Sequence, residues 1–318
     1  MSAQAATSPG RRLRDALQSD TPVIAPGAFN PLLARLIERA GFPAIYAGGS
    51  GISSVVYGRP DMGLSTMTEI RDVVRNIAGA VSIPVLGDID QGFGDLLAVS
   101  RSVREFEAAG LGGVHLEDEA GASKHAQGST PIPVERFCEK LQVALEARTD
   151  PDFMLFARSD ALRPEGMKAT IDRCRAYVDA GADGLWVFTG LSGTPDELTE
   201  IAEAFPDVPL IYDWTVRGIE ARAHLDEIRA MGYRLVIVPN LFLFAQVAQA
   251  DRMLREIQEQ GSIAHLLGEV APVPLVDEVV GLEAARAFQR QHSAPTYVSD
   301  AGGKHWTFGD HATAGKES

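Results

Sequence analysis

Two aspartates at the end of a strand-like segment are the residues whose type and spacing first suggest chemistry. Residues 85–90 read Val-Leu-Gly-Asp-Ile-Asp, an apolar run after Pro84 that leads into glycines typical of a tight turn. Side chains two apart on a strand point the same way, so we expect Asp88 and Asp90 to project together. A hard divalent cation such as Mg²⁺ would neutralise such a pair. Alternatively, one aspartate caps the next helix and the other faces solvent.

Two further strand-like segments also end in charged residues. Residues 113–118 close with Glu117 and Asp118, and residues 153–160 contain Arg158 near their end. The carboxyl ends of parallel strands meet at one edge, so the carboxylates and the arginine should come together there. This combination favours a metal-chelated anionic substrate.

The elements that must position these residues repeat as strand, turn and amphipathic helix. A short helix over residues 11–18 precedes the first strand, and Asn30 is predicted to cap a helix over residues 31–40. Eight such units predict an α/β fold, a (β/α)₈ TIM-type barrel with its site at the carboxyl ends of the strands. A doubly wound open sheet is the alternative, but no Gly-x-Gly-x-x-Gly follows the first strand. The strands are expected near residues 23–27, 44–47, 85–90, 113–117, 153–158, 184–188, 210–213 and 235–239.

We expect a single barrel domain over residues 1–318. Its core would run from about residue 11 to 260, followed by a helical appendage over about 261–292 and a flexible tail over 293–318. The appendage contains a short helix around residues 282–291, which either covers its own barrel or packs on a neighbouring subunit.

Composition limits the partners of the chain. Asp and Glu number 43 against 29 Lys and Arg, which gives a net charge of -14 over 318 residues. This charge repels polyanions, so nucleic acid and anionic membranes are not expected partners. Cys138 and Cys174 suggest no disulfide framework, and no segment reads as a membrane span or a signal peptide. The expected location is the cytoplasm.

Five motifs together resemble the isocitrate lyase/phosphoenolpyruvate mutase superfamily, most closely its methylisocitrate-lyase-like branch. They occupy residues 46–51, 58–66, 88–94, 115–118 and 157–161, and the likeness runs from about Leu13 to Arg290. The resemblance implies a Mg²⁺-dependent barrel enzyme, with Mn²⁺ as the alternative ion, acting on small 2-oxo or 2-hydroxy carboxylic acids. It also implies a homotetramer in which the C-terminal helix is exchanged between subunits.

The resemblance assigns the metal and its surroundings. Asp88, Asp90 and Glu117 would hold Mg²⁺, largely through bridging waters. Asp61 would lie over the metal, where it orients water or exchanges a proton. Mg²⁺ chelated by a carboxylate and its neighbouring oxygen would stabilise the enolate left when the adjacent carbon bond breaks.

The resemblance also assigns the residues that contact the substrate. The backbone of Gly49, Ser50 and Gly51 would bind the substrate carboxylate. Arg158 would fork onto it from the opposite strand, and Tyr46 would line the pocket.

The loop after Glu117 departs from the family pattern. The lyases carry Lys-Arg-Cys-Gly-His there, whereas residues 119–128 read Glu-Ala-Gly-Ala-Ser-Lys-His-Ala-Gln-Gly, with His125 at the position of the cysteine. His125 could replace the thiol as general acid, and Lys124 could gate or pair with the substrate. Alternatively, both are exposed residues of a solvated lid. The loop is not of the mutase type, Lys-Thr-Asn-Ser, either.

The sixth strand departs as well. Phe188 stands where the lyases have a glutamate and the mutase-like enzymes a histidine. If it faces the pocket, it favours a smaller or partly apolar substrate; otherwise it is barrel core, like Trp186 on the same face. Asp213 and Asn240, at the ends of the seventh and eighth strands, are candidate pocket residues.

The leading hypothesis is a Mg²⁺-dependent lyase that cleaves a C–C bond of a small 2-hydroxy or 2-oxo (di)carboxylate. The alternative is an oxaloacetate-type decarboxylase or 2-oxo acid hydrolase. The cysteine-free loop resembles that of the oxaloacetate decarboxylase branch. A phosphonopyruvate mutase or hydrolase and a non-catalytic carboxylate-binding barrel are the remaining hypotheses.

Overall fold

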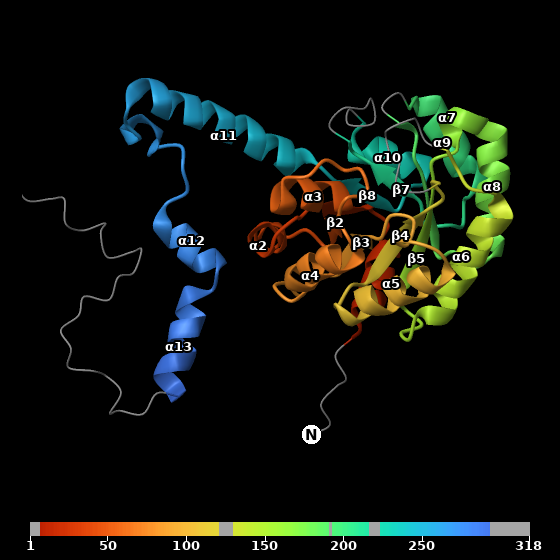
Figure 1. Ribbon diagram of the computed structural model, residues 1–318, viewed down its shortest axis with the longest axis horizontal. Helices are drawn as coiled ribbons and strands as arrows, with labels where there is room; N and C mark the ends of the chain where they lie inside the picture. Colours follow the sequence, from red (N-terminus) through yellow and green to blue (C-terminus); the bar gives the residue numbers. More distant parts are fainter. Residues whose placement is uncertain (1–6, 121–129, 191–192, 216–222, 293–318) are drawn as a thin grey trace, which may run out of the picture. The chain divides into compact units, whose positions relative to one another are not determined.

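The barrel predicted from the sequence is present in the computed structural model, which describes residues 7–120, 130–190, 193–215 and 223–292. Among these residues eight strands pair in parallel, in the orders β1-β8-β7 and β2-β3-β4-β5-β6. Bridges between Gly27 and Tyr46 and between Leu185 and Leu210 join the two sheets into a closed barrel (Figure 1). The strands are β1 Val23–Pro26, β2 Ile45–Ala47, β3 Val85–Asp88, β4 Gly113–Glu117, β5 Met154–Ser159, β6 Gly184–Val187, β7 Ile211–Asp213 and β8 Leu235–Val238.

Helices follow the strands and surround the barrel, as Figure 1 shows for the first unit of the chain. Asn30 caps α2 as predicted, because its side chain accepts a hydrogen bond from the Leu33 N–H at 2.9 Å. Thr66 and Thr194 begin α4 and α9 with reciprocal capping boxes. The helices are α1 Pro9–Leu17, α2 Pro31–Arg39, α3 Gly49–Tyr57, α4 Met67–Ala78, α5 Leu96–Ala108, α6 Val134–Ala147, α7 Leu162–Glu165, α8 Met167–Asp179, α9 Pro195–Ala204, α10 Leu225–Met231, α11 Leu241–Gln260, η3 Ala264–Leu266, α12 Val273–Val279 and α13 Leu282–His292.

Both faces of the strands are buried, which explains their nearly continuous apolar sequences. Alternate side chains pack inside the barrel, among them Tyr46, Leu86, Phe156 and Trp186. The others pack outward against the helices. Because the alternation is strict, the residue at the end of each strand has a defined direction, into the barrel or away from it.

Helix α1 closes the barrel at the amino ends of the strands. Leu13 is fully buried and belongs to the apolar cluster inside the barrel, together with Leu17. The backbones meet closely here: a Cβ added to Gly112 would lie 2.7 Å from the Pro9 carbonyl oxygen. Glycine is therefore required at this contact.

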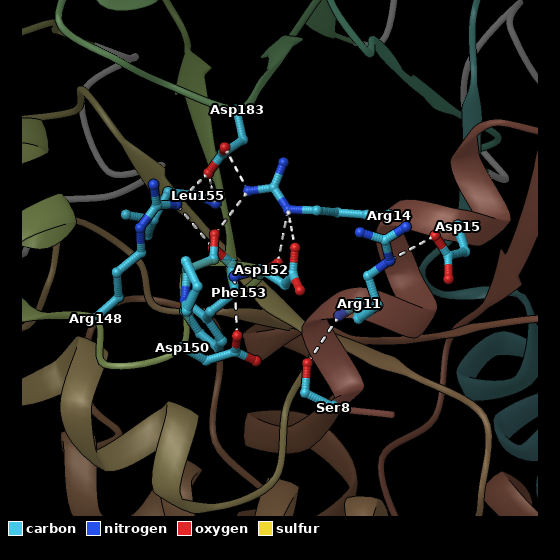
Figure 2. A network of polar contacts seen from close by, with 11 residues as sticks. Ser8, Arg11, Arg14, Asp15, Arg148, Asp150, Asp152, Phe153, Leu155 and Asp183 are labelled. Carbon is cyan, nitrogen blue, oxygen red and sulfur yellow. Dashed lines mark hydrogen bonds and ion pairs between the residues drawn. The ribbon is translucent and has the colours of Figure 1, made fainter. Parts of the chain in front are cut away.

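A polar network around Asp183 fixes α1 to the strands (Figure 2). The Asp183 carboxylate accepts hydrogen bonds from Arg14 Nη2 at 2.6 Å and from Arg148 Nη1 at 2.7 Å. It also accepts from the Leu155 backbone N–H at 2.9 Å. One carboxylate thus joins α1, β5 and the segment before β6, far from the carboxyl ends of the strands.

Replacing Asp183 with asparagine is expected to lower the free energy of unfolding by about 2–3 kcal/mol, because charge-assisted hydrogen bonds to two arginines are lost. Urea denaturation followed by circular dichroism measures this change. Asp152→Asn is the matched control: its carboxylate lies 3.8 Å from Arg14 Nε and is one-third exposed, so its effect should be below about 0.5 kcal/mol. An unchanged unfolding midpoint in the Asp183 variant would contradict this role.

The chain divides into two compact units, residues 1–247 and 248–318. The described part of the second unit contains the remainder of α11, then η3, α12 and α13. Several of its large apolar side chains are exposed, including Leu254, Leu267 and Phe288. The single-domain organisation with an appendage, the exchanged helix and the homotetramer stay predictions. No helix within the described ranges is long and apolar enough to cross a membrane.

Candidate active site

A cavity of about 670 Å³ lies at the carboxyl ends of the strands. Its lining residues come from strands and loops that are distant in sequence but adjacent around the barrel. The structure therefore brings most of the predicted site residues into one space. Those that line it are Tyr46, Ser50, Asp61, Asp88, Arg158, Phe188, Asp213 and Asn240.

The amino end of α3 forms part of this site. Gly48 is the capping residue and has no side chain that could accept from the first N–H groups, so this end can attract an anion. Of the three predicted carboxylate binders, Gly49 donates its N–H to Asp88 Oδ2 at 3.0 Å. Ser50 donates from its hydroxyl to Asn240 Oδ1 at 3.0 Å, which connects the ends of β2 and β8. Gly51 is buried against Phe29.

The path of the chain at Asp88 and Asp90 differs from the predicted one. Strand β3 ends at Asp88, and Asp90 adopts a left-handed backbone with φ 47°, so it does not continue the strand to residue 90 as expected. The Asp90 N–H donates to Asp88 Oδ1 at 2.9 Å. The turn still directs both carboxylates to one place: a Cβ on Gly49 would lie 3.2 Å from Asp88 Oδ2 and 3.9 Å from Asp90 Oδ1.

Arg158, at the end of β5, lies at the centre of a buried ionic cluster. Its Nε and Nη2 donate to Asp160 at 2.7 and 2.8 Å, and its Nη1 lies 3.2 Å from Glu117 Oε2. Burial disfavours its charge, but the carboxylates of Asp160 and Glu117 outweigh that effect and hold the pKa of Arg158 well above its ordinary value. The guanidinium group is therefore a permanent positive charge beside the cavity.

The Nε and Nη2 groups of Arg158 already donate to Asp160, so they do not bind the substrate carboxylate as predicted. Asp160 takes the bidentate face that was expected to bind the substrate carboxylate. An arginine has five N–H donors, so the N–H groups of Arg158 that do not contact Asp160 can donate to a ligand. Two aromatic rings flank the group: its Cζ lies 4.4 Å from the Trp186 ring centroid and 4.8 Å from that of Phe188.

A buried layer of aromatic rings lies next to Asp88 inside the barrel. The Tyr46 hydroxyl and His115 Nε2 are 2.9 Å apart, and the same nitrogen lies 3.5 Å from Asp88 Oδ1. The His115 ring meets Trp186 edge to face, with centroids 4.9 Å apart. These contacts connect β2, β3, β4 and β6 inside the barrel and restrict the orientation of Asp88.

Asp118 positions the end of β5 from outside the barrel. Its carboxylate accepts from the Ser159 hydroxyl and the Tyr177 hydroxyl, each at 2.7 Å, and from the Asp160 backbone N–H at 3.0 Å. Burial raises the pKa of Asp118 above its usual value. By fixing the Asp160 backbone, Asp118 also fixes the carboxylate that orients Arg158.

Asp61 enters the cavity from a loop that is attached at both sides. Before it, Arg59 Nη1 donates to Glu69 Oε1 at 2.9 Å. After it, Glu69 accepts from the Thr66 N–H and hydroxyl, and these hydrogen bonds together with Arg59 lower the pKa of Glu69 to about 2. The loop that carries Asp61 is thus attached to α4 by an ionised carboxylate at neutral pH.

Lys140 of α6 supports the turn that contains Asp90. Its ammonium group donates to the carbonyl oxygens of Gln91 at 2.8 Å and Gly94 at 3.0 Å, and the side chain is buried. Burial lowers the pKa of Lys140. The turn contains several residues with positive φ, including Phe93 at 56°, so it depends on such external hydrogen bonds.

Replacing Lys140 with methionine is expected to destabilise this turn by about 1–3 kcal/mol, because two carbonyl groups lose a charged donor that is itself buried. Hydrogen–deuterium exchange of the peptide covering residues 88–95 should accelerate, whereas exchange in β5 should not. Lys168→Met is the control, since this lysine is 91% exposed and pairs only with the exposed Asp172 carboxylate among the described contacts. Equal exchange in both variants would exclude a supporting role for Lys140.

The carboxylates fit a magnesium site that retains bound water. No group of three or more His, Cys, Asp or Glu side chains among the described residues could hold a metal ion. Asp88 and Asp90 nevertheless converge beside Gly49, and both offer hard oxygen atoms. Mg²⁺ keeps several waters and is usually bound by one or two carboxylates, so this donor set suits it.

Two predicted residues lie outside the described part of the chain, and the structure adds residues to the site that the sequence did not predict. Lys124 and His125 fall within residues 121–129, outside the residues that the structure describes. The sequence reasoning missed the pairing of Asp160, although this residue stands two positions after Arg158, directly after the end of β5. It also missed Leu243 and Phe244, which line the cavity from the start of α11. The apolar run directly after Asn240 was the available signal.

The chain is similar to known proteins in sequence and in fold. The phosphoenolpyruvate phosphomutase family matches residues 13–258 of the chain. A probable 2-methylisocitrate lyase 1 of Corynebacterium glutamicum is 37% identical over 239 residues, which cover 74% of this chain and 77% of that protein. Among solved structures, a phosphonopyruvate hydrolase in complex with oxalate and Mg²⁺ is 32% identical with a TM-score of 0.81, covering 90% of this chain and 99% of the other. An oxaloacetate acetylhydrolase in complex with the product oxalate is 26% identical with a TM-score of 0.82, over 89% and 98%.

Proposed function

Because the chain belongs to the isocitrate lyase/phosphoenolpyruvate mutase superfamily, we propose that it is a Mg²⁺-dependent lyase that cleaves a C–C bond of a small 2-hydroxy or 2-oxo (di)carboxylate. The observation that carries this proposal is the meeting of Asp88, Arg158 and the amino end of α3 around one cavity. The resemblance supports the further proposal of a cytoplasmic homotetramer with exchanged C-terminal helices.

Different residues would bind the metal ion and the substrate carboxylate. Asp88 and Asp90 would hold Mg²⁺, with Glu117 reaching it through water; the ion would supply the positive charge that stabilises an enolate. The Gly49 N–H already donates to Asp88, so the next N–H groups of α3 and the outer N–H groups of Arg158 would bind the substrate carboxylate. The aromatic rings around Arg158 exclude water and strengthen these electrostatic contacts.

Proton transfer needs a group other than a thiol. The chain has two cysteines, Cys138 on α6 and Cys174 on α8, and neither is among the described residues that line the cavity. Cys174 is fully buried, and burial raises the pKa of its thiol. Among the described residues, Asp61 lines the cavity and is the candidate for proton transfer. His125 stays a candidate general acid because of its position in the sequence.

A second candidate function is an oxaloacetate-type decarboxylase or a hydrolase of 2-oxo acids. The lack of a thiol acid favours it, since a metal-stabilised enolate can form from an oxaloacetate-like acid without a protein group that protonates a departing carbanion. The likeness to an oxaloacetate acetylhydrolase supports the same alternative.

A mass-spectrometric turnover screen tests the proposal. The purified chain with Mg²⁺ is incubated with methylisocitrate, dimethylmalate, oxaloacetate and phosphonopyruvate, and Asp90→Ala and His125→Ala variants are treated in parallel. Two organic products other than oxalate with acetate, lost in the Asp90 variant, support the lyase. Pyruvate with CO₂, or oxalate with acetate, supports the second candidate, and released phosphate indicates phosphonopyruvate chemistry. Binding without any turnover would leave a non-catalytic carboxylate-binding barrel.

A further inference from the structure

One part of the cavity wall is apolar. Trp186 and Phe188 contribute aromatic rings from β6 and its carboxyl end, and Pro239, Leu243 and Phe244 follow from the segment after β8. The rings of Trp186 and Phe188 contact each other edge to face, with centroids 6.2 Å apart. Phe188 is therefore oriented by its neighbours rather than free to leave the cavity.

The positive charge available to a ligand is limited. Arg158 is the one lysine or arginine among the described residues that line the cavity. Much of its hydrogen-bonding capacity is already used, since it contacts both Asp160 and Glu117. The amino end of α3 adds a partial positive charge beside it. These groups suffice for one carboxylate.

A second carboxylate at the far end of a ligand would meet a different environment. It would find no further cationic side chain among the described lining residues, and it would lose hydration against the rings and the Leu243 side chain. Placing a charge in apolar surroundings without a partner is costly. An alkyl or aryl group in the same place would instead gain about 25 cal/mol for each Å² removed from water.

We propose that the substrate carries an apolar substituent at the end opposite its 2-oxo or 2-hydroxy acid head, and that Phe188, Leu243 and Phe244 bind it. This inference rests on the proposed function for the identity of the head group. Within the proposed class it selects alkyl- or aryl-substituted monocarboxylates over acids with a second carboxylate at that end. Phe188 and Leu243 are then specificity-determining residues.

A matched pair of unreactive ligands tests this preference without turnover. N-oxalylglycine and N-isobutyloxamate share the oxamate head, and their tails have similar shape, one ending in a carboxylate and the other in two methyl groups. Isothermal titration calorimetry with the full chain and Mg²⁺ should show N-isobutyloxamate binding at least tenfold more tightly. Phe188→Gln and Leu243→Gln should each reduce that ratio several-fold. Leu97→Gln, at an 89% exposed position of α5, should leave it unchanged.

The outcomes separate this inference from the proposed function. Equal or tighter binding of N-oxalylglycine would overturn the inference, while cleavage of a 2-oxo or 2-hydroxy acid into two organic products other than oxalate with acetate in the turnover screen would still support the lyase. An unchanged ratio in both glutamine variants would overturn the assignment to Phe188 and Leu243. If neither oxamate binds, the head-group site itself is wrong, and the inference fails together with the proposed function. Leu243→Gln serves as the independent variant because Phe188→Gln also removes a ring from Arg158.

Discussion

Replacing Arg158 with methionine is expected to abolish turnover and to lower the free energy of unfolding by about 3–5 kcal/mol. The loss of stability follows from the partners left behind, since Asp160 and Glu117 are 3% and 1% exposed and would remain as buried carboxylates near each other. The loss of activity follows from removing the one described cationic side chain that lines the cavity. Urea denaturation measures the first effect, and the turnover screen the second.

A double variant separates these two effects. In Arg158→Met/Asp160→Leu one of the stranded carboxylates is removed as well, so part of the lost stability should return. Turnover should not return, because the positive charge is still missing. Arg158→Lys keeps the charge but lacks the planar fork that binds Asp160, so its stability and turnover should both fall between those of the other variants and the native chain. A fully stable and active Arg158→Met protein would refute the account of the cluster given above.

Strand alternation explains why much of this cluster was predictable from sequence. Asp88, Glu117, Arg158 and Trp186 are all set by the two-residue period of buried strands, and that period is visible as soon as the strands are located. The eight strand-helix units likewise follow from local signals, such as the Asn30 cap. Local pattern and tertiary structure agree at these residues.

Other parts of the site depend on information that alternation does not contain. The left-handed backbone of Asp90 gives its carboxylate a direction that it would not have in a strand. The only sequence signal for this conformation is the glycines that follow Asp90. Several carboxylates lie near Arg158, and it pairs with that of Asp160 because Asp118 holds the Asp160 backbone in place. The contribution of Phe244 comes from how α11 begins after β8. Each of these is fixed by tertiary contacts.

The second large effect is expected at Gly49, where the stability and the function of the site should respond in different ways. Gly49 is the first residue of α3 and has no positive φ, so alanine suits its backbone and should change the free energy of unfolding by less than about 1 kcal/mol. The added Cβ, however, would lie 3.2 Å from Asp88 Oδ2, so this carboxylate must move by a few tenths of an ångström. It is also the carboxylate that accepts the Gly49 N–H.

Turnover by Gly49→Ala should therefore fall about 100-fold, because small displacements of groups that position a reaction have effects of this size. The Mg²⁺ concentration needed for half-maximal ligand binding should rise in the same variant, which calorimetry with N-isobutyloxamate measures independently of turnover. Gly268→Ala is the control, since a Cβ there meets nothing within 4 Å among the described atoms. If Gly49→Ala keeps native turnover and metal dependence, Asp88 has room to move and its exact position is not what the site requires. If it loses both while its unfolding midpoint stays native, the contact between the first turn of α3 and Asp88 belongs to the catalytic machinery rather than to the scaffold.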